Sequence, residues 1–403
     1  MKRIVITGLG VVSAIGSDLG AFRDSLFAGR SGIAPIALFD ASEHAVKVYG
    51  ELKNYVAEEH FDSSRLALLD RFTQLGLVAA REAVRHSGID FSDPALARRS
   101  GVFHGTGIGG QATQDQAYLR LYGERKPRLN PTTVPRLIPS AAASQLSIEF
   151  GIHGPAMTLA GACAASGHAL ANAVLMLRAG MLDAALVGGS EAMGAPGSMR
   201  AWEALRVLAH DTCRPFSKDR TGTVLAEGGA MAIVETLEHA QARGATIHAE
   251  ILGFGMSSDA FHPIQPDETG IARAIQSALA DAGLAPEQVD YINAHGTATP
   301  QNDPAESKAI RLALGRHADR VAVSSTKSMH GHTLGAASAT ELAACVLALQ
   351  AQCAPPTMNY GRSDPDCDLD YVPNEARSMP MHVALNHSFA FGGLNVVTAL
   401  RRW

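Results

Sequence analysis

One cysteine of this sequence stands where its thiol can serve as a nucleophile. Cys163 follows an apolar run, residues 157–160, and precedes residues 169–177, whose apolar spacing predicts a buried helix. A cysteine on such a strand-to-helix turn lies at a helix N-terminus, where unpaired amides and the helix dipole stabilise a thiolate. Its own amide can also point at a developing oxyanion. Taken alone, Cys163 is better explained as a small buried side chain, so the catalytic interpretation depends on the rest of the chain.

Two further segments offer imidazoles. His295 stands at the end of an expected strand, and His332 shares a turn with Lys327 and His330, with Glu341 on the helix that follows. Each histidine, taken singly, is more often structural than catalytic. Histidines at i and i+2 without nearby carboxylates also make a poor metal site, and a cysteine bound to zinc would no longer be a free nucleophile. We therefore expect no metal.

The composition is that of a globular protein. With 403 residues the chain exceeds one small core, so two domains or two fused halves are expected. The net charge is −5 without a basic tail, which argues against nucleic acid as a partner. Five scattered cysteines indicate reduced thiols and a cytoplasmic location. No apolar run is long enough to span a membrane, and the first residues predict a strand and no signal peptide.

Strand, turn and helix patterns alternate along the chain and predict an α/β fold. The segment 321–350 repeats the layout of the cysteine segment, because a strand runs into a turn with reactive residues and then into an Ala-rich helix. Two such segments suggest an internal duplication with a pseudo-twofold axis. We place the halves at residues 1–245 and 246–403.

Two glycine-rich stretches need a separate interpretation. Residues 105–110 match G-x-G-x-x-G after a strand, which raises the possibility of an NAD-dependent oxidoreductase. No acidic residue closes a strand about twenty positions later, so close packing of the backbone is the better explanation. Residues 386–395 combine aromatic side chains with paired glycines. They form either a mobile loop with a bulky plug or a tight turn before the final strand, 396–400.

Together these segments resemble the elongating β-ketoacyl–acyl-carrier-protein synthases of the Cys-His-His, KAS II-like type. The resemblance covers essentially the whole chain in order, and residues 204–216 look closest to the specialised nodulation-type branch, which makes unusual, often unsaturated acyl chains. It implies a thiolase-like fold, in which two duplicated halves form five αβαβα layers. Its four motifs are Ala-Cys-Ala at Cys163, His-Gly-Thr-Ala-Thr-Pro from His295, Ser-Ser-Thr-Lys-Ser-Met-His-Gly-His ending at His332, and Phe-Ala-Phe-Gly-Gly-Leu-Asn at residues 389–395.

The resemblance implies a decarboxylative condensation. Cys163 would hold the acyl chain as a thioester, and its amide would form an oxyanion hole with that of Phe391. Malonyl on an acyl carrier protein would lose carbon dioxide, and His295 and His332 would donate ring N–H groups to the enolate. Lys327, with Glu341, would orient and polarise His332, and Phe391 would gate the cysteine.

The remaining carried-over residues bind substrates and partners. No cofactor is expected beyond the phosphopantetheine of the carrier protein, and the assembly is expected to be a homodimer or a heterodimer with a chain-length-factor-like subunit. Trp202 beside Ile108 would limit chain length, although a core or dimer-interface role explains Trp202 nearly as well. The expected pantetheine-binding residues are Thr297 and Thr299, the expected acyl-pocket residues are Ile108, Trp202 and Phe389, and the expected docking cations, if they are more than solvated charges, are Arg65, Arg125, Lys126 and Arg206.

The sequence also departs from the resembling family. Ala390 replaces a usual glycine, Leu394 a small polar residue and His330 a common threonine, and the segment 215–222 reads Pro-Phe-Ser…Arg-Thr-Gly. Two other classes are disfavoured. Thiolases acting on coenzyme A thioesters carry a second cysteine where Phe391 stands, and chain-length factors lack the nucleophile.

Overall fold

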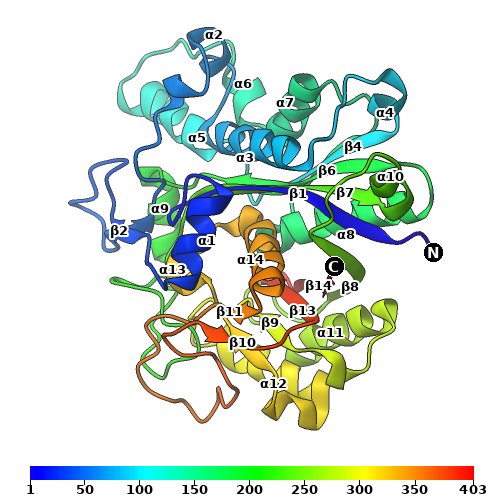
Figure 1. Cartoon of the computed structure of the whole chain (residues 1–403). Coiled ribbons are helices and arrows are strands. Elements are labelled where there is room, and N and C mark those ends of the chain that lie inside the picture. Colours follow the sequence, from blue (N-terminus) through cyan, green and yellow to red (C-terminus); the bar gives the residue numbers. More distant parts are fainter.

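The computed structural model describes residues 1–403, and its main feature is one mixed sheet of ten strands (Figure 1). The strand order is β10-β9-β13-β14-β8-β1-β7-β6-β4-β5. The strands are β1 (Ile4–Ser13), β4 (Ser100–Gly105), β5 (Ala156–Leu159), β6 (Ala184–Glu191), β7 (Gly228–Thr236), β8 (Ala249–Ser258), β9 (Tyr291–Asn293), β10 (Ala322–Ser324), β13 (Val383–Ala390) and β14 (Leu394–Arg402).

The two halves of this sheet have the same topology. In the first half, β1 and β6 lie antiparallel to β7, and β4 lies parallel to β6 and β5. In the second half, β8 and β13 lie antiparallel to β14, and β9 lies parallel to β13 and β10. The halves meet where Ile4–Ile6 of β1 pair with 249–251 of β8. This arrangement confirms the predicted duplication.

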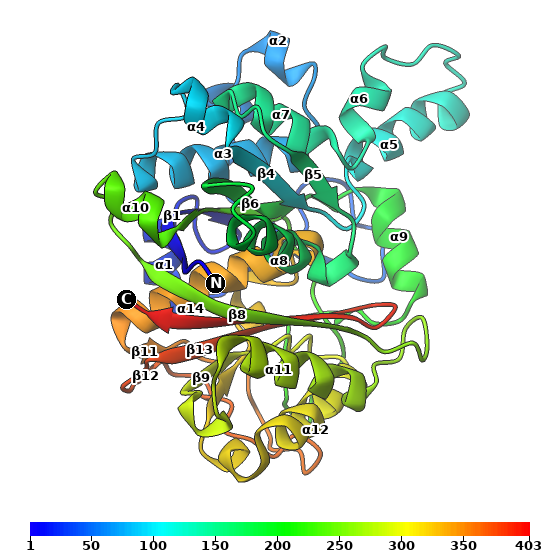
Figure 2. The same cartoon turned by 90° about the vertical axis from the view of Figure 1, so that its right-hand side faces the viewer.

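Helices complete five layers. In Figures 1 and 2, α3 (Arg71–Ser87) and α7 (Ala141–Phe150) cover the outer face of the first half, and α11 (Glu268–Ala282) and α12 (Asn302–Leu314) cover that of the second. Between the two halves lie α8 (Ala165–Arg178) and α14 (Ala337–Ala351). The α/β, thiolase-like αβαβα fold is therefore confirmed.

Helix α14 is the most apolar element of the chain. Residues 334–351 are long and apolar enough to cross a membrane, but 89% of this stretch is buried inside the fold. Its burial follows from its place in the middle layer, where both faces pack against strands or against α8. The stretch is therefore the central core helix.

Local capping explains where α3 begins. The sequence predicts one helix from 66 to 87, whereas the structure has α2 (Ser63–Leu66) and, separately, α3 from Arg71. The carboxylate of Asp70 accepts the amide of Phe72 and so starts a new helix. Gly88 ends it in the left-handed conformation at φ 63.

The glycines at 105–110 are explained by packing. A Cβ on Gly105 would collide with the backbone of residues 165 and 166, and one on Gly110 would collide with residues 136 and 137. The close-packing interpretation of this stretch therefore accounts for its glycines without a dinucleotide.

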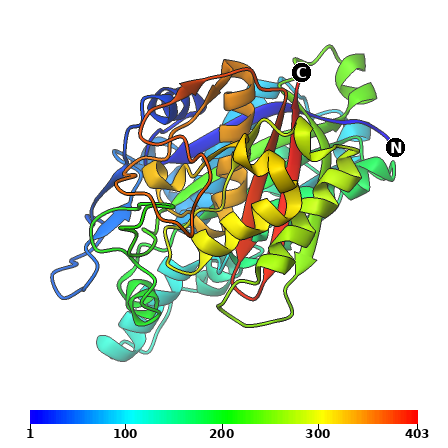
Figure 3. The ribbon, with the colours of Figure 1, turned by 90° about the horizontal axis from the view of Figure 1, so that it is seen from below.

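The last two strands form a hairpin that Figure 3 shows beneath α11 and α12. The sequence predicts a loop over 386–395, but residues 386–390 belong to β13 and 394–395 to β14. The side chains of β13 are buried on both faces of the sheet. The β13–β14 strand pairing extends to Ala390, which lies opposite Leu394. The turn itself is Phe391, Gly392 and Gly393, and both glycines have positive φ.

The remaining elements are shorter and flank this framework. They are α1 (Leu19–Phe27), β2 (Ile33–Pro35), β3 (Val48–Gly50), α4 (Pro94–Arg98), α5 (Gln111–Tyr118), η2 (Leu119–Gly123), α6 (Thr133–Leu137), η3 (Ala162–Ala164), α9 (Pro196–Ala204), α10 (Leu237–Ala242), α13 (Lys327–His330), η6 (Leu334–Ala336), β11 (Cys353–Ala354) and β12 (Arg377–Ser378), with single 3-10 turns at 57–59, 286–288 and 315–319.

Candidate active site

The cysteine stands on a tight turn between β5 and α8. It is the middle residue of η3, and Ala162 before it has a φ of 46. The second half contains the same turn at η6, where Leu334 also has a φ of 46 before α14 begins. The fold therefore places Cys163 at the N-terminus of a central helix, on a turn that the duplication repeats.

Burial dominates the acidity of this thiol. Desolvation raises the pKa of Cys163 to about 12, and the charge of Lys327 only partly offsets this effect. The expectation of a stabilised thiolate is therefore wrong for the resting protein. Burial outweighs the charge of Lys327 and the backbone hydrogen bond that lower the pKa, so the thiol is neutral at rest.

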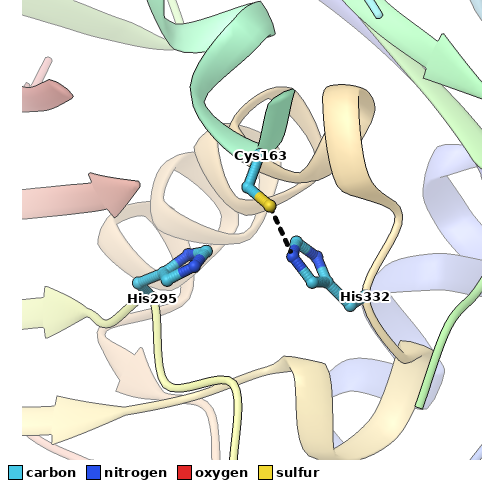
Figure 4. A group of neighbouring side chains, drawn as sticks. All are labelled: Cys163, His295 and His332. Carbon is cyan, nitrogen blue, oxygen red and sulfur yellow. Dashed lines mark hydrogen bonds between the residues drawn. The ribbon is translucent and has the colours of Figure 1, made fainter. Parts of the chain in front are cut away.

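Two histidines face the sulfur from the second half (Figure 4). Nε2 of His332 lies 3.0 Å from Sγ of Cys163. The rings of His295 and His332 meet edge to face, with centroids 5.4 Å apart. Ligand atoms of all three residues lie within 4.8 Å of one another. The fold thus brings the cysteine and both predicted histidines into one cluster.

Hydrogen bonds determine which ring nitrogen of each histidine carries the proton. The amide of Leu334 donates to Nδ1 of His332 over 3.3 Å, and Nζ of Lys327 lies 3.4 Å from Nδ1 of His295. An amide N–H and an ammonium can only donate, so both Nδ1 atoms accept. The proton of each neutral ring therefore sits on Nε2, and in His332 that atom faces Cys163.

Burial also keeps both rings neutral. It lowers the pKa of His295 and of His332 well below the ordinary range, and the charge of Lys327 acts in the same direction. A neutral imidazole with Nε2–H is a hydrogen-bond donor that adds no positive charge to the site. Such donors are what an enolate requires.

The lysine serves a different histidine from the one expected. Lys327 is fully buried and forms an ion pair with Glu341, and its ammonium points at His295. No hydrogen bond joins Lys327 to His332, whose Nδ1 is already occupied by the Leu334 amide. The prediction that Lys327 and Glu341 orient His332 is therefore corrected: Lys327 contacts His295, Glu341 holds Lys327, and Lys327 influences His332 through its charge alone.

A carboxylate that the sequence does not predict lies behind His295. Glu306 on α12 accepts the amides of His295 and Gly296, each over 2.8 Å, and its Oε1 lies 3.2 Å from Nδ1 of His387. It thereby fixes the backbone from which the imidazole projects. Nothing in the sequence marks Glu306, because two of its partners are backbone amides and the third, His387, lies 81 positions away.

A pocket of about 270 Å³ opens onto the cluster. Cys163, His295 and His332 lie at its base. Of the other predicted site residues, its lining includes the gating residue Phe391, the substrate-binding residues Thr297, Thr299, Trp202 and Phe389, and the docking residue Arg206.

The family comparison agrees with this geometry. The model of the beta-ketoacyl synthase N-terminal domain matches residues 1–240, and that of the C-terminal domain matches residues 248–361. The chain belongs to the beta-ketoacyl synthase family. It is thus a condensing enzyme of the acyltransferase class, as the resemblance implied.

Two curated relatives match this synthase over its whole length. It is 46% identical over 401 residues to nodulation protein E of Rhizobium sp. (strain N33), covering 100% of this chain and 99% of the relative. It is 41% identical over 409 residues to 3-oxoacyl-[acyl-carrier-protein] synthase 2 of Coxiella burnetii, again covering 100% and 99%.

Two solved structures match this synthase equally completely. The ishigamide ketosynthase/chain length factor is 36% identical with a TM-score of 0.95, and the coverage is 100% of this chain and 99% of that chain. The second structure is a type II polyketide ketosynthase, bound to the hexaketide, in complex with its acyl-carrier protein. It matches at 34% identity with a TM-score of 0.91, and the coverage is again 100% of this chain and 99% of that chain.

The synthase does not bring every predicted residue to the pocket. Ile108 does not line this pocket and is 46% exposed, so the expected wall of Trp202 beside Ile108 stays a prediction. Arg65 pairs with Glu149 over 2.8 Å, and Lys126 pairs with Glu124 over 2.7 Å. The neighbouring Arg125 lies away from the pocket as well. Among the four predicted docking cations, Arg206 alone lines the mouth.

The last hairpin accommodates the two residues, Ala390 and Leu394, that differ from those usual in the family. Ala390 is buried at the end of β13, and Leu394 is 38% exposed on the opposite strand. The hydrogen bond at this end of the hairpin comes from Asn395, whose side-chain amide donates to Asp259 over 2.6 Å. Asp259 also accepts the amide of Asp267 over 3.0 Å, so it ties the hairpin to the loop before α11.

A metal ion remains an alternative occupant of the cluster, because cysteine and two histidines are zinc ligands. The tautomers argue against it, since the Nε2 atom of His332 that faces the sulfur carries a proton. The buried ammonium of Lys327 would also repel a dication. The expectation of no metal stays a prediction that a chelator can test.

Proposed function

We propose that this synthase joins an acyl chain held on Cys163 to a malonyl unit carried by an acyl carrier protein. The observation that carries the proposal is the pair of neutral imidazoles whose Nε2–H groups are set by donors at both Nδ1 atoms. The 3-oxoacyl-[acyl-carrier-protein] synthase 2 named above supports the nature of the substrates.

The first step is acyl transfer to the cysteine. Sγ of Cys163 attacks the thioester carbonyl of the acyl carrier protein, and the bond from that carbonyl to the pantetheine sulfur breaks. The proton lost by the Cys163 thiol ends on the pantetheine sulfur, which leaves as a thiol. The N–H of Phe391, which donates to no other group, is available to the tetrahedral oxyanion together with the amide of Cys163.

The second step makes the carbon–carbon bond. The malonyl thioester loses its carboxylate as carbon dioxide, and the electron pair moves into an enolate whose oxygen accepts from Nε2 of His295 and His332. The enolate carbon then attacks the acyl carbonyl on Cys163, and the carbon–sulfur bond breaks. The released thiolate takes up a proton, which restores the resting thiol. No cofactor enters beyond the phosphopantetheine of the carrier protein.

The walls of the pocket support delivery by a pantetheine arm. The hydroxyls of Thr297 and Thr299 lie 3.0 Å apart in the wall, and they offer donors and acceptors to the amides of the arm. Arg206 is exposed at the mouth and offers a cation to an acidic carrier protein. Arg65, Arg125 and Lys126 remain proposed docking cations outside the pocket.

The assembly and location belong to the same proposal. A homodimer, or a heterodimer with a chain-length-factor-like subunit, is supported by the ketosynthase/chain length factor structure that this chain matches. The five cysteines form no disulfide, which supports a cytoplasmic location for the protein, because thiols stay reduced there. The boundary between residues 245 and 246 stays a prediction, which is supported by the connection between α10 and β8.

Intact-mass spectrometry on protein and carrier protein tests the proposed function. The protein should gain one acyl group from an acyl carrier protein thioester, and addition of malonyl carrier protein should then yield 3-oxoacyl carrier protein. Cys163→Ala should show neither product. Turnover of coenzyme A thioesters with no adduct from the carrier-bound thioester would instead indicate thiolase chemistry and overturn the proposal.

A further inference from the structure

The glycine-rich loop at residues 105–110 wraps a buried carboxylate of this chain. Glu191 ends β6, which lies parallel to β4, and its side chain is fully buried. Its Oε2 accepts the amide of Gly107, and its Oε1 accepts the hydroxyl of Thr106 over 3.0 Å. Backbone amides of such a loop can bind an anion, and here the chain supplies that anion itself.

The same carboxylate also contacts the second half of the fold. Oε2 of Glu191 accepts the amide of Gly335 in η6 over 3.1 Å. The two backbones approach closely at this point, because a Cβ on Gly335 would lie 2.3 Å from the nitrogen of Gly107. A Cβ on Gly107 would lie 2.9 Å from Oε2 of Glu191. One side chain thus ties the loop after β4 to the turn before α14.

The turn that Glu191 holds is also the turn that sets the proton on His332. The amide of Leu334 donates to Nδ1 of His332 over 3.3 Å. Leu334 carries this amide in the left-handed region, at φ 46, which costs energy for a leucine and must be held by its surroundings. On one side of Leu334, the His332 amide donates to the carbonyl of Val224 over 2.7 Å. On the other side, the Gly335 amide is held by Glu191.

We propose that Glu191 is a positioning residue for His332. By binding the Gly335 amide, its carboxylate holds Leu334 in the left-handed conformation, so the Leu334 amide stays on Nδ1 and the ring proton stays on Nε2. Without this acceptor, Leu334 relaxes to negative φ and its amide swings away from the ring, so the proton can occupy either nitrogen. This inference rests on the proposed role of His332 as a donor to the enolate, and it names the residue that maintains that donor.

The contacts of Glu191 require its shape and its acceptor atoms more than its charge. Oε2 accepts both amides, whereas Oε1 meets the hydroxyl of Thr106, which can donate or accept. A glutamine reproduces this pattern, because its carbonyl oxygen can accept both amides and its amide nitrogen can donate to Thr106. A leucine of similar size offers no acceptor. The pair of variants therefore separates the hydrogen bonds from the filling of space.

The position of the proton on His332 can be observed by nuclear magnetic resonance. In protein isotope-labelled at the histidine ring nitrogens, a nitrogen that carries a proton resonates well apart from one that does not, and a His332→Gln sample identifies the signals of this ring. The parent and Glu191→Gln should both show Nε2 protonated and Nδ1 unprotonated. Glu191→Leu should move both signals toward the average of the two tautomers. Parent-like signals in Glu191→Leu would overturn the proposal.

Glu235→Leu is the matched control. Glu235 is also fully buried, but it lies opposite Ala184 at one end of the β6–β7 pair, whereas Glu191 lies opposite Gly228 at the other end. Its loss should leave the His332 signals as in the parent, and an equal change in this control would overturn the specific role of Glu191. If Glu191→Leu does not fold, Glu191→Asp decides, because it shortens the reach of the carboxylate and should move the signals in the same direction.

Kinetics connect this proton to the reaction. Glu191→Leu should lower kcat for decarboxylation of malonyl carrier protein by on the order of tenfold, which is less than the loss expected when the donor is removed outright. KM and the acyl adduct at Cys163 should stay as in the parent, and Glu191→Gln should restore kcat. A parent protein that decarboxylates no malonyl carrier protein would contradict the proposed function. An active parent with an equal kcat in Glu191→Leu would contradict the role of Glu191 alone.

Discussion

The sulfur of Cys163 lies 3.0 Å from Nε2 of His332, although 169 positions separate the two residues in the sequence. His332 cannot take the cysteine proton through that atom, because the Leu334 amide occupies its Nδ1 and the proton already sits on Nε2. In this contact, the Nε2–H group of His332 is a hydrogen-bond donor that faces the sulfur of Cys163. Cysteine activation and enolate binding are thus separable by experiment.

The first prediction concerns the pH dependence of acylation. Since burial raises the pKa of Cys163 to about 12, the thiolate fraction should grow about tenfold per pH unit below that value. Quenched-flow mass spectrometry between pH 7 and pH 9 should show an acylation rate that rises without a plateau. A plateau near neutral pH, or an adduct on Cys213, Cys345 or Cys353, would contradict this assignment.

The second prediction separates the histidines from the nucleophile. His295→Ala and His332→Ala should each slow decarboxylation of malonyl carrier protein by about a hundredfold or more, because one donor to the enolate is lost. Both variants should still form the acyl adduct. His382→Ala, at an exposed histidine, is the matched control. Parent rates of decarboxylation in both active-site variants would exclude the proposed role.

The third prediction concerns the buried ion pair. Lys327→Met should destabilise the protein by about 3–5 kcal/mol, because Glu341 loses its partner and must be buried unpaired or take up a proton. The double change Lys327→Met with Glu341→Leu should recover most of this stability in urea unfolding. It should not recover decarboxylation, because Nδ1 of His295 has lost its donor. Recovery of both properties would reduce Lys327 to a structural residue.

The fourth prediction concerns docking. Arg206→Glu should raise the KM for acyl carrier protein and flatten its salt dependence, because a cation at the pocket mouth is reversed. Arg316→Glu, at an exposed cation in the 3-10 turn 315–319 and outside the pocket lining, is the control. Equal kinetics of Arg206→Glu and the parent at low salt would make Arg206 an ordinary surface charge.

The fifth prediction concerns stability and pH. Glu191 accepts the amides of Gly107 and Gly335, but burial dominates and raises its pKa to about 7 from 4.5. The folded protein therefore holds this proton more tightly than the unfolded chain. The resulting contribution to the free energy of unfolding is present below about pH 4.5 and is lost as the pH rises to about 7. The loss is on the order of 3 kcal/mol.

Urea unfolding at pH 5 and pH 8 measures this loss. Glu191→Gln removes the titrating group, so its stability should fall less between the two pH values than that of the parent. Part of the slope should remain, because burial also raises the pKa of Asp303 to about 7. An unchanged slope would show that Glu191 titrates normally.

Much of the fold and of the cluster could be predicted from the sequence. Local apolar runs and small residues predict the turn at Cys163 and the strand end at His295. The repeated strand, turn and helix pattern predicts the duplicated sheet. The order of motifs was enough to infer that Cys163, His295 and His332 meet.

What the sequence did not provide depends on tertiary contacts. The high pKa of Cys163 arises from desolvation by residues far along the chain. Lys327 contacts His295 and not His332 because of the way α13 packs. Glu306 itself stands in no motif, and it binds backbone amides, which every residue type except proline supplies. The extent of β13 was missed because burial on both faces hides the alternation that marks a strand.

The paired turns before the two central helices have a consequence for how this gene could evolve. Gly335 in η6 occupies the place that Cys163 holds in η3, and a Cβ there would collide with the backbone of Thr106 and Gly107. A second thiol is therefore sterically forbidden in the second copy. In this fold, of the two matching turns, the turn before α8 is the one with room for a side chain that bears a nucleophile.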